Sequence, residues 1–145
     1  AAAGNVVRTF KKACGGIMDL KSYFENNRGT GIISTADSEG NVDCAVYARP
    51  HVMEDGTIAM IMRDRLSHKN LQSNPKAAYM FIEKGPGYKG KRLFLTKVKE
   101  ERDSELIDSL KRRTYSDDDA PGKEGKFLVY FKVEKELPLI GAGED

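Results

Sequence analysis

The stretch Ile61-Met62-Arg63-Asp64-Arg65-Leu66-Ser67-His68-Lys69-Asn70-Leu71-Gln72-Ser73-Asn74-Pro75 decides how this chain folds. The β-rich run 57–63 predicts a strand, and Ser67 is placed to cap a short helix that Asn74 and Pro75 end. The free amides and positive dipole end of a helix start attract anions. Four basic side chains lie close by in sequence: Arg63, Arg65, His68 and Lys69. The stretch therefore predicts a phosphate site, and a solvated basic turn after a strand stays open as the alternative.

The composition of the 145 residues fits one small domain with a single core. Hydrophobic residues make up 39%, and no apolar run approaches the roughly 20 residues of a membrane helix. The 24 basic and 22 acidic residues are interspersed, so the net charge of +2 argues against nucleic-acid binding as the main role. Two cysteines, Cys14 and Cys44, and two histidines are too few for a disulfide framework or a structural zinc site. This cysteine usage favours a reducing cytoplasm.

Residues 1–17 differ from the rest of the chain. They carry basic residues without an apolar core of signal-peptide length, so secretion is not expected. Met18 resembles a natural start, and we interpret residues 1–17 as a flexible or non-native tail before one domain at 18–145. A genuine extension that packs on the domain or on a partner is the alternative.

Short strands and turns alternate along the body of the chain. Strands are predicted at 30–36, 42–49, 57–63, 77–83, 92–99 and 127–133, with residues 51–53 extending the second. Helices are predicted at 20–27, after Ser67 and at 101–113. Six antiparallel strands joined by hairpins favour a closed or nearly closed barrel, because closure removes exposed strand edges. We therefore expect a mainly β, α+β fold with short flanking helices.

The order of these features resembles the pyridoxamine 5'-phosphate oxidase-like family of split barrels. The resemblance covers roughly 20–139, and it is most specific where Ser67, Lys69, Asn74 and Pro75 stand between two strands. It implies a six-stranded antiparallel split barrel. It also implies flavin mononucleotide (FMN) at the interface of a homodimer, with both subunits contributing to the site.

The resemblance also implies which residues contact the cofactor. Strand residues near the flavin ring and phosphate would be Tyr47, Ala48 and Arg49, and the next strand end would bring Met62 and Arg63 to the ribityl phosphate. The turn Ser67, His68 and Lys69 would grip the phosphate, although His68 stands where the family has Arg, so Arg63 or Arg49 would supply the missing charge. Arg92 would reach the flavin from the second subunit. A structural role would instead pair Arg49 with Asp43 or Glu54, and place Met62 in the core.

The chain shows no general base, nucleophile or metal cluster, which a flavin does not require from its protein. True pyridoxamine 5'-phosphate oxidases resemble one another in a C-terminal segment with Arg and Trp, and this chain has no Trp. The hypothesis is therefore a dimeric FMN-dependent oxidoreductase of unknown substrate, unlike a true pyridoxamine phosphate oxidase. Two alternatives stay open: a non-catalytic flavin carrier or redox sensor, and a haem- or deazaflavin-binding relative whose longer ligand uses the basic loop 89–92.

Overall fold

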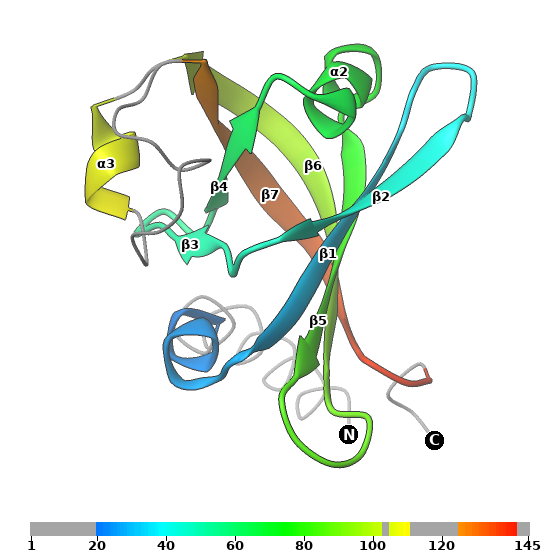
Figure 1. Cartoon of the computed structure of the whole chain (residues 1–145), viewed down its shortest axis with the longest axis vertical. Helices are drawn as coiled ribbons and strands as arrows, with labels where there is room; N and C mark the ends of the chain where they lie inside the picture. The colour runs from blue at the N-terminus through cyan, green and yellow to red at the C-terminus, as the bar shows by residue number, and fades with distance from the viewer. Residues whose placement is uncertain (1–19, 103–104, 111–124, 142–145) are drawn as a thin grey trace, which may run out of the picture.

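A computed structural model describes residues 20–102, 105–110 and 125–141. The predicted tail at 1–17 and part of the helix predicted at 101–113 lie outside these residues. The described chain forms one antiparallel sheet with short helices around it (Figure 1). The strands are β1 (Gly29–Ala36), β2 (Val42–Tyr47), β3 (His51–Val52), β4 (Ile58–Arg63), β5 (Lys76–Glu83), β6 (Gly90–Arg102) and β7 (Lys126–Pro138); the helices are α2 (Leu66–Ser73), α3 (Leu106–Leu110) and an N-terminal helix at 20–26. None of these helices is long and apolar enough to cross a membrane.

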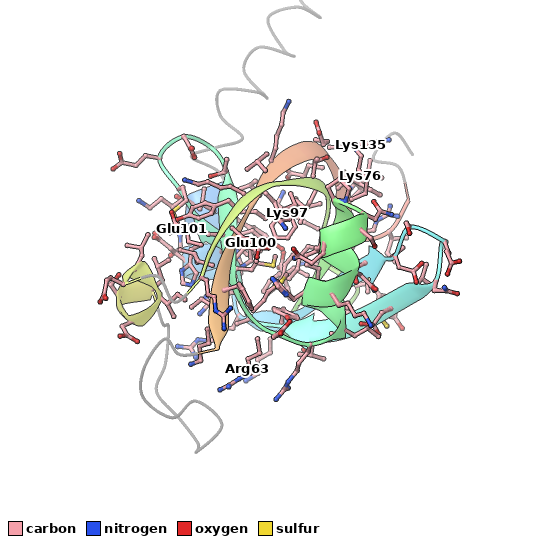
Figure 2. All side chains as sticks on the ribbon, turned by 90° about the horizontal axis from the view of Figure 1, so that it is seen from above. Arg63, Lys76, Lys97, Glu100, Glu101 and Lys135 are labelled. Atoms are coloured by element: carbon pink, nitrogen blue, oxygen red, sulfur yellow. The ribbon has the colours of Figure 1, made fainter. Side chains whose placement is uncertain are left out.

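The sheet curls into a half-barrel with the strand order β2-β1-β5-β6-β7-β4-β3. Viewed from above, it bends around an interior filled by side chains, with α2 over the open end (Figure 2). The two edge strands, β2 and β3, are joined through Ala48, Arg49 and Pro50. The mainly β split-barrel prediction is confirmed, but the sheet has seven strands instead of six. The difference arises after Pro50, where His51 and Val52 pair with β4 as a separate strand instead of extending β2.

The core lies inside the curl and is built around aromatic rings. Phe24, Tyr79 and Phe81 are fully buried, and their rings meet edge to face at centroid distances of 5.4 and 6.1 Å. Phe24 comes from the N-terminal helix, so that helix closes one side of the barrel. Arg49 fastens it there, because its Nη1 donates to the carbonyl oxygens of Phe24 (2.6 Å) and Asn27 (2.9 Å) at the helix end.

A smaller cluster packs on the other face of β4 and β7. Ile107 of α3 is fully buried there against Ala59, Leu128 and Tyr130. The helix predicted from residue 101 begins only at Leu106, so its start is wrong. Residues 101–102 belong to β6 instead, where Glu101 and Arg102 pair with Leu128 and Phe127 of β7. The pairing between two 13-residue strands outweighs the helical pattern that the apolar residues Leu106, Ile107 and Leu110 predict.

Candidate functional site

A cavity of about 380 Å³ lies between β2, the end of β4 and the start of α2. Four of the residues predicted from the sequence meet there: Tyr47, Ala48, Arg63 and Ser67. The full lining is Asp43, Cys44, Ala45, Val46, Tyr47, Ala48, Ile61, Arg63, Arg65, Leu66 and Ser67. The cavity therefore combines a strand wall on one side with two guanidinium groups and a helix start on the other.

The strand wall is fixed from inside the barrel by Tyr79. Its hydroxyl lies 3.1 Å from the carbonyl oxygen of Ala48 and 3.4 Å from that of Tyr47. The ring reaches them by passing over Gly31, where a Cβ would lie 1.8 Å from the Tyr79 hydroxyl oxygen. The backbone of Tyr47 and Ala48 is thus held by a fully buried side chain from another strand.

The helix start differs from the prediction. Arg65, in extended conformation, is the N-cap residue of α2, and no side chain caps the first turn. The prediction of Ser67 as the N-cap is wrong, because Ser67 already lies within the helix and is 3% exposed. The Ser67 hydroxyl hydrogen-bonds to Tyr47 instead. Burial raises the pKa of the Tyr47 phenol, and the hydrogen bond from Ser67 and the charge of Arg65 partly oppose this rise. The C-terminal boundary at Asn74 is confirmed.

His68 and Lys69 line a different cavity. His68 is a buried residue of α2, with its ring stacked on Phe127 at 3.8 Å and its two nitrogens facing Asp64 and Glu100. It shares an open cavity of about 630 Å³ with Arg65, Lys69 and other residues, so Arg65 belongs to both cavities. The structure therefore does not bring His68 to the predicted cluster of Tyr47, Ala48, Arg63 and Ser67.

Glu100 on β6 lines this second cavity and contacts several of its polar residues. Lys97 Nζ lies 2.7 Å from its Oε1, and Gln72 Nε2 donates to the same oxygen at 3.0 Å. Figure 2 shows Lys97 and Glu100 close together beside α2. Burial alone would raise the pKa of Glu100, but the hydrogen bonds from Lys97, Gln72 and His68 and the charge of His68 outweigh it and lower the pKa to about 2.

The three other predicted residues have structural partners. Arg49 holds the N-terminal helix, as described above. Arg92 lies on β6, where its Nε donates to the Pro138 carbonyl (2.9 Å) and its Nη2 to the Gly141 carbonyl, which fastens the end of β7. Met62 is fully buried in the core, as the packing alternative predicted, and it is not among the residues that line the cavity.

An exposed apolar strip borders the first cavity. Side chains alternate along β2, so Val42, Cys44 and Val46 share its outer face, which we call the β2 face. Val42 is 82% exposed and Val46 76%. Leu66, at the start of α2, adds a further exposed apolar side chain on the cavity rim. Contiguous apolar surface of this kind is typical of a protein interface.

No protein-family model and no curated protein matches the chain. Among solved structures, an FMN-binding protein from Syntrophomonas wolfei superposes with a TM-score of 0.67 at 23% identity, over 94% of this chain and 98% of that protein. A Lactobacillus delbrueckii protein provisionally named a pyridoxamine 5'-phosphate oxidase gives a TM-score of 0.60 at 16% identity, over 82% and 90% of the two chains. This chain has the pyridoxamine 5'-phosphate oxidase-like split-barrel fold. An F420 reductase shares that fold, with a TM-score of 0.60 at 12% identity over 76% of this chain and 90% of the reductase.

Within this split barrel, two residues of the candidate site are not predicted from the sequence. The basic pattern at 63–69 includes Arg65 but does not predict that this residue is the N-cap beside the cavity. For Tyr79 the sequence pattern predicts only a strand position, although its hydroxyl positions the cavity wall. The position of Arg65, two residues before Ser67, was a local signal that could have placed it at the helix start. No local signal indicated the role of Tyr79, because its hydrogen-bond partners are 31 and 32 residues away.

Proposed function

We propose that this chain binds FMN in the cavity between β2 and α2. The observation that carries the proposal is the meeting of Arg63, Arg65 and the uncapped start of α2 at one cavity. Guanidinium groups and helix N-termini are the donors that bind phosphate in proteins. A solved structure with the same fold is that of an FMN-binding protein, which supports the choice of ligand.

The residues present fit the parts of this cofactor. Arg63, Arg65 and Ser67 would hold the phosphate, and the backbone of residues 43–48 would lie along the ring system, kept in place by Tyr79. When bound, FMN supplies hydride or electron transfer to a small substrate. The chain's own contribution is to bind, to orient the ring and to limit access of water to it. We propose an oxidoreductase of unknown substrate on this basis.

We further propose that the site is completed in a homodimer. The cavity opens beside the β2 face and Leu66, so an FMN ring bound there would be flanked by exposed apolar side chains on one side. A second copy of this chain covering that face would bury both the side chains and the ring. Arg92 as a contact from that second subunit, and Arg49, Met62, His68 and Lys69 as contacts from the first, stay predictions from the family resemblance.

The test compares FMN with riboflavin, which lacks the phosphate. A charge-assisted hydrogen bond contributes about 1.5–3 kcal/mol, so Arg63→Ala and Arg65→Ala should each weaken FMN binding by about tenfold to a hundredfold and leave riboflavin binding unchanged. Arg28→Ala, at an exposed position before β1, is the matched control and should change neither. Equal losses for both ligands would place the phosphate elsewhere.

The absorbance spectrum of the purified protein, taken before and after loading with FMN and desalting, is the first measurement. Retention of about one flavin per chain supports the proposal; failure to retain it overturns the proposal. The F420 reductase of the same fold makes a deazaflavin the second ligand to load. Turnover of the reduced flavin with candidate acceptors then separates an enzyme from a flavin carrier.

A further inference from the structure

His68 is held between two carboxylates that come from different parts of the chain. Its Nδ1 lies 3.1 Å from Asp64 Oδ1, and its Nε2 lies 3.0 Å from Glu100 Oε2. The side chain is 6% exposed, and the ring is stacked on Phe127 with an interplanar angle of 18°. Asp64 precedes α2, Glu100 is on β6 and Phe127 is on β7, so the ring joins three elements.

These contacts define the protonation state that suits the site. A neutral imidazole has one donor and one acceptor nitrogen, whereas a carboxylate only accepts. Both contacts are hydrogen bonds only when both ring nitrogens carry a proton. The Nε2 of Gln72 is 3.1 Å from His68 Nε2, but its two hydrogens are directed to the His68 carbonyl and to Glu100, both at 3.0 Å. Only the imidazolium form can therefore donate to both carboxylates at once.

The other charged groups around His68 come from all the elements packed against it. On α2 and its N-cap, Lys69 and Arg65 line the same cavity. On β6, Lys97 contacts Glu100, and the Arg102 guanidinium lies 5.7 Å from the Phe127 ring centre. On β7, Lys126 is buried next to Phe127. Among the described residues, no group of three or more His, Cys, Asp or Glu side chains is arranged to hold a metal ion.

We propose that the His68 imidazolium is a positioning residue that fixes the start of α2 and thereby makes phosphate binding at the neighbouring cavity depend on pH. The proposal rests on the proposed FMN site. Arg65 and Ser67, which line that cavity, stand three residues and one residue before His68 in the chain, so the contact to Glu100 holds both in place. When His68 becomes neutral, one ring nitrogen presents a lone pair to a carboxylate. The first turn of α2 loses that anchor, and affinity falls as pH rises.

The first test uses flavin-free protein and NMR. As pH is varied from about 5 to about 8, the amide signals of Arg65 and Ser67 should move together with the ring signals of His68. In Glu100→Gln the carboxylate that faces Nε2 is replaced by a neutral amide, so the amide signals of Arg65 and Ser67 should no longer follow the ring signals of His68. His51, the second histidine of the chain, is the internal reference and should titrate alike in both proteins. Unchanged His68 and amide transitions in Glu100→Gln would overturn the proposal.

The second test measures affinity. The FMN phosphate gains its second charge near about pH 6, so each variant is compared with the wild type at the same pH. The measured quantity is the FMN affinity of the wild type divided by that of Glu100→Gln. This ratio should fall by about tenfold as His68 becomes neutral, which is the size expected for one charge-assisted contact. The same ratio for riboflavin should not change. Glu101→Gln, one residue further along β6, should match the wild type.

The two proposals fail differently. Absence of FMN binding at every pH overturns the proposed function and, with it, the link to phosphate affinity, whereas the flavin-free NMR titration still decides whether His68 positions α2. FMN binding with the same pH dependence in the wild type and Glu100→Gln overturns the positioning role alone.

Discussion

Gly31 shows how one missing side chain sets the cavity wall. Tyr79 crosses it to reach the backbone of Tyr47 and Ala48, and a Cβ at Gly31 would also lie 2.5 Å from the Tyr47 carbonyl oxygen. Neither neighbour can retreat easily, because one is a fully buried ring and the other is strand backbone. The fit at this position is therefore a requirement of both the core and the site.

We expect Gly31→Ala to lower the free energy of unfolding by about 1–3 kcal/mol, the range for overpacking a well-packed core. Urea denaturation measures this. Ser34→Ala, at an exposed position of the same strand, is the control and should change stability little. A stable Gly31→Ala variant with wild-type flavin affinity would contradict the role given to Tyr79.

The candidate site was predictable where it depends on local order in the chain. Tyr47, Ala48, Arg63 and Ser67 end two strands and begin a helix, and the structure brings them to one cavity. His68 was not predictable, because its partner Glu100 is 32 residues away and its stacking on Phe127 depends on tertiary packing. A sequence gives the residue type at such a position but not the direction of its side chain.

At the scale of elements, α2 is tied to β6 through Glu100. The pKa of this carboxyl is lowered from 4.5 to about 2 in the fold. A group with a lowered pKa stabilises the folded state above its unfolded pKa, and this contribution is lost as pH falls toward the folded value. We expect the stability of the wild type to fall between about pH 4.5 and about pH 2 more steeply than that of Glu100→Gln.

Denaturant unfolding at several pH values checks this expectation. Glu39→Gln, at an exposed turn position, is the control and should keep the wild-type slope. Parallel pH curves for the wild type and Glu100→Gln would show that Glu100 does not link the two elements.

The elements themselves could largely be predicted, because alternation and turn residues are local signals. The strands 30–36, 57–63 and 77–83 agree with β1, β4 and β5 to within one residue. The misses have long-range causes. β3 forms a strand because it pairs with β4, and β6 extends to Arg102 because it pairs with β7. Propensity is a weak guide where a partner strand decides.

For the whole molecule, the β2 face is the feature that bears on assembly. If a second copy covers it, a charge placed there would be buried without a partner. We expect Val46→Asp to be a monomer in sedimentation experiments at saturating FMN and to bind FMN more weakly, while the wild type is a dimer. Val98→Asp, at an exposed position on β6, is the control and should stay dimeric. A monomeric wild type under these conditions would contradict the shared site.

Cys44 lies in the middle of the β2 face and is exposed in the single chain, so the protein carries its own chemical reporter of assembly. A thiol at a covered face reacts with an alkylating reagent only when the subunits part. In a Cys14→Ser background, the labelling rate of Cys44 should rise on dilution and fall when FMN is added. A rate independent of protein concentration and of FMN would mean that the outer face of β2 meets water in every state.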